Sequence, residues 1–193
     1  MKFSVIIPTY YNPEKIQRCI EALEKQTYMP QEAIVVYSSC DNATKERLTR
    51  LKEKISLKVK ALPVKEMSRM SVVLNAGIKK SLGDVVCFLD EDVIPDRKWL
   101  SGIKDCLMDS DVAACGGKDI IILKGRKRQF KETDKVGIIK WKGYIVGNQN
   151  RGRVKKEVMF LKGCNMAVKK EYLKMLDENL LGLVRWELFT TLA

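Results

Sequence analysis

The sequence predicts an α/β fold with a mostly parallel central sheet and helices on both faces of that sheet. Short apolar runs alternate through residues 3–117 with segments whose apolar residues recur at helical spacing, and this order is typical of βαβ units. Val85–Leu89 is apolar at every position, as in a strand that is buried on both faces. The connections are short, so they leave little room for a second domain before Gly117.

Each element of this first part is predicted by its own local pattern. Runs of β-branched and other apolar residues predict strands at Phe3–Ile7, Ala33–Tyr37, Leu57–Ala61, Val85–Leu89 and Val112–Cys115. Residues suited to caps or first turns predict helix starts at Asn12 or Pro13, at Asp41 or Asn42, and at Pro95; a further helix covers Met70–Lys80. One apolar face per helix is expected, made by Ile16, Cys19, Ile20 and Leu23, by Leu48, Leu51 and Ile55, and by Trp99, Leu100, Ile103 and Leu107.

After Gly117 the pattern is less regular. The expected elements are a strand at Asp119–Leu123, paired strands or an extended loop at Val136–Val146, a strand at Val158–Leu161, a helix at Lys170–Met175 and a last helix opening at Arg185–Phe189. The segment Lys162–Val168 is expected to lead into the first of these helices. The chain therefore changes character near Gly117.

Three acids follow the apolar run Val85–Leu89 directly. Acids just past the carboxyl end of a parallel strand lie where open α/β sheets bind ligands. Asp90 and Asp92 are two residues apart, so their carboxylates can converge on one hard cation such as Mg²⁺ or Mn²⁺. The alternative is a solvated acidic loop between a strand and a helix.

The net charge of +12 predicts an anionic partner, such as a nucleotide diphosphate, an acidic membrane surface or nucleic acid. The excess is concentrated in two clusters, Lys124, Arg126, Lys127, Arg128 and Lys131, and Arg151, Arg153, Lys155 and Lys156. Solvated loops are one interpretation of these clusters, and contact with lipid phosphates is another.

The absence of histidine and the scattered positions of the cysteines limit which residues can act as a base or bind a metal. The chain has no histidine, so a general base must be a carboxylate, Lys, Tyr or Cys. Its six cysteines form no CxxC pair, which favours free thiols in a reducing cytoplasm over disulfides or a zinc site. No apolar run approaches the roughly 20 residues of a membrane helix, and nothing at Met1–Pro8 is typical of a secretion signal.

Several separated stretches occur in an order that resembles one family. They are Val5–Tyr10 with Asn12, Asn75–Ile78, Gly83–Asp92, Gly163–Val168 and Leu176–Asn179. In this order they resemble the family 2 glycosyltransferases, which are inverting, nucleotide-sugar-dependent enzymes of the GT-A fold. The resemblance covers nearly the whole chain and implies one catalytic domain over 1–193, with a nucleotide-sugar-binding half at 1–117 and an acceptor-side half at 118–193.

The resemblance implies a role for each matched residue of the donor site. Asp90-Glu91-Asp92 matches the DxD motif, so Asp92 would be the main ligand of Mn²⁺ or Mg²⁺ on the donor diphosphate, and Asp90 would lie near the ribose or sugar. A loop that lines the base and ribose is matched by Pro8, Thr9 and Tyr10. Arg69 matches an arginine near the nucleotide in some members, although a surface arginine is the alternative.

The resemblance also implies a catalytic base. Trp186–Glu187 falls where the family has a Glu-Asp pair, so Glu187 would deprotonate the acceptor hydroxyl. The alternative is an exposed glutamate at a helix N-terminus. Tyr37-Ser38 replaces an acidic pair that binds uracil, so Ser38 can still hydrogen-bond the base but uridine specificity is open. The chain ends where members usually continue, which suits either a short protein or a catalytic-domain fragment.

The sequence thus predicts a metal-dependent inverting glycosyltransferase, cytoplasmic or peripheral at the cytoplasmic membrane face. The basic clusters suit a lipid-linked glycan or polyisoprenyl phosphate as acceptor, although a protein-linked acceptor is also compatible. One alternative is a sugar nucleotidyltransferase, but Pro8–Tyr11 lacks the glycine-rich loop with Arg and Lys that such enzymes carry. The other is a basic module without catalysis that binds nucleic acid or membrane; the scattered aromatic residues show no stacking pattern, so nucleic acid is not expected.

Overall fold

The computed structural model describes residues 1–65 and 67–179 of the chain. Its centre is a six-stranded sheet in the order β3-β2-β1-β4-β10-β5. The strands are β1 (Phe3–Thr9), β2 (Glu32–Ser38), β3 (Val59–Val64), β4 (Val85–Leu89), β5 (Ala114–Gly116) and β10 (Asn165–Lys169). The first four are parallel to one another, and β10 runs antiparallel between β4 and β5. The predicted mostly parallel sheet is confirmed.

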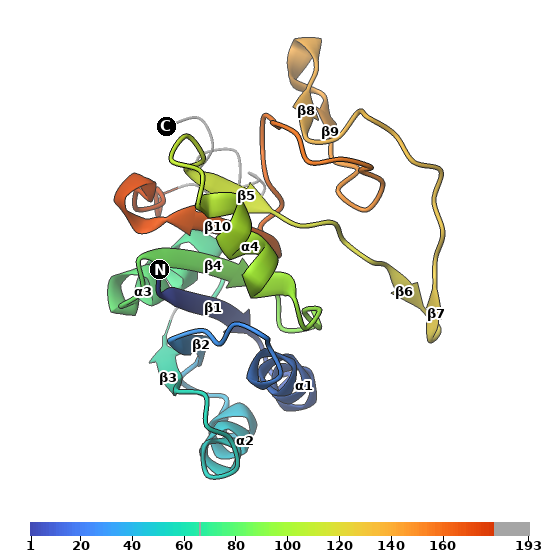
Figure 1. Ribbon diagram of the computed structural model, residues 1–193. Helices are drawn as coiled ribbons and strands as arrows, with labels where there is room; N and C mark the ends of the chain where they lie inside the picture. Colours follow the sequence, from blue (N-terminus) through green and yellow to red (C-terminus); the bar gives the residue numbers. More distant parts are fainter. Residues whose placement is uncertain (66, 180–193) are drawn as a thin grey trace.

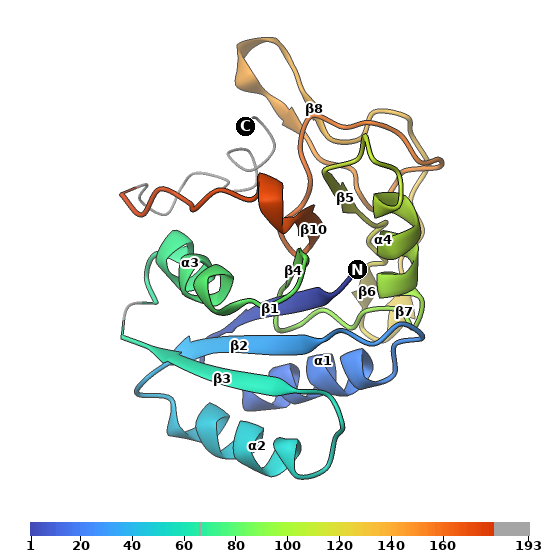
Figure 2. The same cartoon turned by 60° about the vertical axis from the view of Figure 1, so that its left-hand side comes forward.

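Helices cover both faces of this sheet (Figure 2). They are α1 (Pro13–Glu24), α2 (Asn42–Lys52), α3 (Met70–Lys80) and α4 (Trp99–Leu107). One hydrophobic cluster joins α1, α2 and α4 to one face, and a second joins α3 to the other. Within β1, Val5 and Ile7 belong to the first cluster and Ile6 to the second, because successive side chains of a strand point to opposite faces. Burial on both faces explains the continuous apolar runs in the sequence.

The helix starts follow the predicted signals with two differences, one of which is that α4 begins at Trp99 rather than at Pro95. Asp41 caps α2 by accepting a hydrogen bond from the backbone N–H of Thr44 at 3.0 Å. Asn12 occupies the cap position of α1, but its side chain makes no capping hydrogen bond. The second helix ends at Lys52, before Ile55, and β3 begins at Val59 rather than Leu57.

A buried carboxylate ties the start of the sheet together. Glu32 is fully buried and forms an ion pair with Lys60 Nζ at 2.6 Å. It also accepts hydrogen bonds of 2.8 Å from Ser4 Oγ and from the N–H of Leu82. Burial, the largest single influence, acts to raise the pKa of Glu32, but the hydrogen bonds from Lys60, Leu82 and Ser4 together hold it below its ordinary value.

The part after Gly117 contains short hairpins beside the sheet (Figure 1). They are β6 (Ile122–Leu123) with β7 (Arg126–Lys127), and β8 (Ile138–Ile139) with β9 (Ile145–Val146), the latter joined through a 3-10 turn at Trp141–Gly143. Paired strands within Val136–Val146 are confirmed. The strand predicted over Asp119–Leu123 was too long, and Val158–Leu161 is not a strand.

The largest error concerns the last strand of the sheet. The sequence predicted that Lys162–Val168 leads into a helix at Lys170–Met175, whereas Asn165–Lys169 is β10 and only Lys170–Tyr172 forms a 3-10 turn. Pairing with β4 and β5 decides this conformation, and tertiary context of that kind overrides local propensity. The helix predicted from Arg185 lies outside the described residues.

The cysteines are free thiols, as predicted, and Cys19, Cys87, Cys115 and Cys164 are buried. Burial is the main reason why the pKa of Cys19 and that of Cys115 are raised to about 12. No helix among the described residues combines the length and apolarity needed to cross a bilayer.

Candidate functional site

The loops that follow β1 and β4 meet at the carboxyl end of the sheet. The two strands are parallel neighbours, with Ile6 opposite Phe88, so their ends lie at the same edge. Thr9 is the last residue of β1, so Pro8 and Thr9 belong to the strand rather than to the predicted loop. Tyr10 follows β1, and Asp90 to Asp92 follow β4. This is the position at which open α/β sheets bind ligands.

Glu91, the middle acid, joins these two loops. Its carboxylate accepts hydrogen bonds from Thr9 Oγ1, from the backbone N–H of Tyr10 at 3.0 Å and from Asn12 Nδ2 at 2.5 Å. From the sequence, no role was assigned to Glu91, whose partners Thr9 and Asn12 lie about 80 residues earlier in the chain. The sequence did contain a signal for this contact. Thr9 and Asn12, two side chains that can donate hydrogen bonds, lie at and just after the end of β1, which is the parallel neighbour of β4. Glu91 therefore orients the loop that the sequence assigned to the nucleoside.

Asp90 and Asp92 lie on either side of Glu91 with exposed side chains. Asp92 makes no hydrogen bond or ion pair to the described part of the chain. The acids concentrate negative charge here: after burial, the charges of Asp90, Asp92 and Glu91 contribute to the raised pKa of the Cys19 thiol. The structure thus brings the two predicted metal ligands to the predicted edge and leaves their carboxylates accessible to a ligand.

The donor set fits a divalent ion that shares its coordination with a substrate. Within residues 1–65 and 67–179, no group of three or more Asp, Glu or Cys side chains is arranged to hold a metal. Asp90 and Asp92 are the exposed carboxylates directly after β4. Mg²⁺ typically binds through one or two carboxylates together with phosphate oxygens and water rather than in an all-protein cage. The residues therefore suit a cation that arrives with a diphosphate.

The loop after β2 supports the other side of the β1 loop. Asp41 is buried, and besides capping α2 it accepts a hydrogen bond from the N–H of Tyr11 at 3.0 Å. Ser38 is buried at the end of β2, where its Oγ accepts from the N–H of Cys40 at 3.3 Å. The carboxylates of Asp41 and Glu91 thus fix the predicted nucleoside loop from two sides.

Arg69 contacts a segment far along the chain. Its Nη1 donates to the carbonyl of Glu178 at 3.0 Å. Asn75, on α3, donates to the carbonyl of Leu176 at 2.9 Å and to Glu178 Oε1 at 2.8 Å, and it accepts from the N–H of Leu176 at 2.9 Å. Two of the family-like stretches, around Asn75 and around Leu176, therefore contact each other. Glu187, the predicted base, lies outside the described residues.

A polar network lies beside β4 on the β10 side. Asn165 Oδ1 accepts from Trp99 Nε1 at 2.8 Å and from the N–H of Gly117 at 3.2 Å, while its Nδ2 donates to Asp119 at 3.1 Å. Asp119 also pairs with Lys162 at 2.8 Å. Burial, then Asp119, and to a smaller extent Asp90 raise the pKa of Cys164 to about 11. Asp119 was not among the predicted site residues, yet it adds a half-buried carboxylate near this edge.

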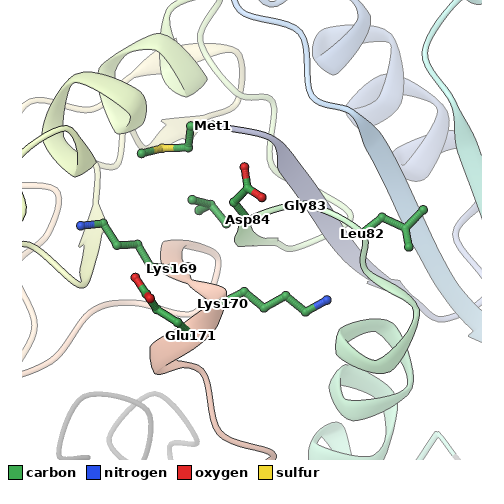
Figure 3. A pocket seen from close by; sticks show the side chains of 8 residues that line it. Met1, Leu82, Gly83, Asp84, Lys169, Lys170 and Glu171 are labelled. Atoms are coloured by element: carbon green, nitrogen blue, oxygen red, sulfur yellow. The ribbon is translucent and has the colours of Figure 1, made fainter.

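A hollow of about 680 Å³ opens at the opposite end of β4 (Figure 3). Lys169 and Lys170 line it, but their ammonium groups point away from each other in Figure 3. Each donates to backbone carbonyls, Lys169 to Asp109 and Ser110 and Lys170 to Ser81. These lysines do not converge on one anion, so the candidate site remains at the carboxyl end.

Comparisons with known proteins agree with this geometry. Residues 4–176 match the family described as Glycosyl transferase family 2. Glycosyltransferase AglE of Haloferax volcanii is 33% identical over 116 residues, which are 59% of this chain and 38% of AglE. Poly(ribitol-phosphate) beta-N-acetylglucosaminyltransferase TarS of Staphylococcus aureus is 32% identical over 137 residues, which are 69% of this chain and 24% of TarS. The chain thus spans less than two fifths of the length of these relatives.

Solved structures show the same fold. The structure of TarS residues 1–349 from S. aureus with UDP-GlcNAc superposes with a TM-score of 0.68 at 21% identity, covering 99% of this chain and 52% of that one. Mannosyltransferase PcManGT from Pyrobaculum calidifontis, solved with GDP-Man and Mn²⁺, gives a TM-score of 0.57 at 26% identity over 61% of this chain and 36% of that one. The chain belongs to glycosyl transferase family 2. The GT-A fold predicted from the resemblance is confirmed.

Proposed function

We propose that this chain is the catalytic domain of an inverting glycosyltransferase that moves a sugar from a nucleotide-diphospho-sugar to an acceptor. The observation that carries the proposal is the pair of exposed carboxylates, Asp90 and Asp92, beside the loop of β1 that Glu91 holds. Membership of family 2 supports it. Membership of this family also disfavours the alternative function of a sugar nucleotidyltransferase.

In this proposal the carboxyl ends of β1, β2 and β4 bind the donor. Pro8–Tyr10, at the end of β1, and Ser38 line the nucleoside, and Arg69 lies near it. Asp92 would hold Mn²⁺ or Mg²⁺ with help from Asp90, and the bound ion would supply positive charge to the leaving diphosphate. The proposal assigns donor binding to 1–117 and acceptor binding to 118–193, within one domain.

Glu187 is the proposed base that takes the proton of an acceptor hydroxyl as that oxygen attacks the anomeric carbon from the face opposite the leaving diphosphate. An acceptor that is a lipid phosphate needs less help, because its oxygen is already ionised at neutral pH. A lipid-linked glycan or polyisoprenyl phosphate therefore remains the proposed acceptor class. Comparing a hydroxyl with a phosphate acceptor in Glu187→Gln tests this base, since only turnover of the hydroxyl acceptor should fall strongly.

The donor is tested by a hydrolysis screen of UDP- and GDP-sugars with Mn²⁺ or Mg²⁺. GDP-mannose is included because the PcManGT structure contains GDP-Man and Mn²⁺. Metal-dependent binding or hydrolysis of one nucleotide sugar, lost in Asp92→Asn, supports the proposal. Salt-sensitive binding of any polyanion, unchanged in that variant, contradicts it and favours the non-catalytic basic module.

A further inference from the structure

The β6–β7 hairpin lies at the end of an extended segment beside the central sheet (Figure 1). Ile122 pairs with Lys127 and Leu123 with Arg126. The turn between them is Lys124-Gly125, and both residues have positive φ, 49° and 74°. Such a turn matches the twist of a tight two-residue hairpin. The element is therefore a regular hairpin rather than an irregular loop.

The residues that lead into β6 and those of β6 itself expose consecutive aliphatic side chains to solvent. Ile120, Ile121, Ile122 and Leu123 are 56%, 41%, 65% and 56% exposed, and neither hydrophobic cluster of the described chain includes them. A two-stranded hairpin alone is marginally stable in water, and contiguous exposed apolar surface marks an interaction site. The hairpin therefore has the properties of a surface that is covered by a partner.

The second strand and its flanks supply the charge. All five cations of the first basic cluster, Lys124, Arg126, Lys127, Arg128 and Lys131, are exposed, and residues 120–131 contain no acid. The nearest following acid, Glu132, pairs with Lys118 and Arg153 outside the hairpin. Aliphatic side chains next to cations suit the interface of an anionic bilayer. Single-stranded nucleic acid is recognised by aromatic platforms, whereas the aromatic ring here, Phe130, is covered by the guanidinium of Arg128 at 5.5 Å.

We propose that the β6–β7 hairpin, residues 120–131, docks onto an anionic lipid bilayer. Ile120–Leu123 enter the boundary between headgroups and acyl chains, and the cations of residues 124–131 contact lipid phosphates. This docking is a property of the hairpin and requires no transferase chemistry. Its use in presenting a lipid-linked acceptor to the site rests on the proposed function.

The test is co-sedimentation of the full chain with vesicles of phosphatidylcholine, with or without phosphatidylglycerol, in the absence of any nucleotide sugar. Binding is expected only to the anionic vesicles, and it should weaken as salt rises. Each Lys or Arg near an anionic surface is worth about fivefold in affinity, so Arg126→Gln/Lys127→Gln should reduce binding by about 25-fold. The matched control, Lys52→Gln/Lys54→Gln at the end of α2, removes the same charge from an exposed site and should bind like the wild type.

A second variant, Ile122→Ser/Leu123→Ser, distinguishes a bilayer from a soluble polyanion. It keeps every charge, so an unchanged affinity for vesicles would show simple electrostatic adsorption and overturn the proposal. The proposal also fails if the α2 control loses as much binding as the hairpin variant, or if neutral and anionic vesicles bind equally. A concentration-dependent dimer abolished by the serine variant would assign the surface to a second copy instead. Thermal unfolding of each variant serves as the control that the sheet is intact. None of these outcomes depends on the transfer of a sugar, so the test is independent of the proposed function.

Discussion

The chain before Gly117 is buried to a greater extent than the stretch between Gly117 and β10. Before Gly117, β1 and β2 have seven residues each and β4 has five, nearly all buried between helices. After it, β6, β7, β8 and β9 have two residues each and are exposed or half-buried. The proposed donor side is thus largely buried, whereas much of the proposed acceptor side is exposed surface.

The contrast between the parts predicts unequal costs for the same truncation. Phe88, in β4, is 1% exposed, and Phe130 is 36% exposed. Phe88→Ala should lower the free energy of unfolding by about 3–5 kcal/mol, because it leaves a cavity between packed layers. Phe130→Ala should cost less than about 1 kcal/mol. Urea unfolding of both variants measures this, and equal losses would mean that the stretch around Phe130 is packed as tightly as the central sheet.

Within the first part, Asp92 is expected to matter for turnover and not for folding. Asp92→Asn should reduce kcat/KM by about 100- to 1,000-fold, because it removes a ligand of the cation that stabilises the leaving diphosphate. Asp105→Asn, on the exposed side of α4, makes the same change of charge and serves as the control. A steady-state assay with the donor found in the screen would refute this role for Asp92 if both variants kept wild-type activity.

Glu91 should have an intermediate effect, mainly on donor binding. Glu91→Gln keeps the shape of the side chain but removes its charge. The charge-assisted hydrogen bonds from Thr9, Tyr10 and Asn12, each worth about 1.5–3 kcal/mol, are therefore weakened or lost. The loop that lines the nucleoside loosens, so KM for the donor should rise by roughly 10- to 100-fold with a smaller change in kcat. Glu53→Gln, just after α2, is the matched control. If kcat fell while KM stayed constant, Glu91 would act on the reacting atoms rather than through the loop.

The sequence predicted the first part well because its signals are local. Val85–Leu89 is apolar at every position, which predicts a buried strand, and the acids that follow it mark the carboxyl end of the sheet. The strand at Asn165–Lys169 was not predicted, because its conformation depends on pairing with β4 and β5, which lie far away in the sequence. Glu91 was missed for the same reason, since its donors Thr9 and Asn12 are about 80 residues earlier. Long-range partners of this kind leave no periodic signal in a single sequence.

The smallest expected changes in the free energy of unfolding come from two ion pairs, a buried one in the first part and an exposed one in the second. Glu32 is fully buried with Lys60, whereas the Glu132 side chain is 51% exposed beside Lys118 and Arg153. At neutral pH, Glu32→Gln should cost about 1–3 kcal/mol of unfolding free energy. Glu132→Gln should change it by less than about 0.5 kcal/mol.

The two pairs should also differ in their dependence on pH. The pKa of Glu32 lies below its ordinary value of 4.5 in the folded chain, so the unfolded chain binds its proton first as pH falls. The stability that Glu32 contributes is therefore complete above the ordinary pKa and is lost as pH falls through the lowered one. Urea unfolding from pH 7 downward should show the wild type and Glu32→Gln converging as the pH falls below the ordinary pKa of 4.5. A difference that stayed constant with pH would mean that shape, and not charge, accounts for the role of Glu32 in the sheet.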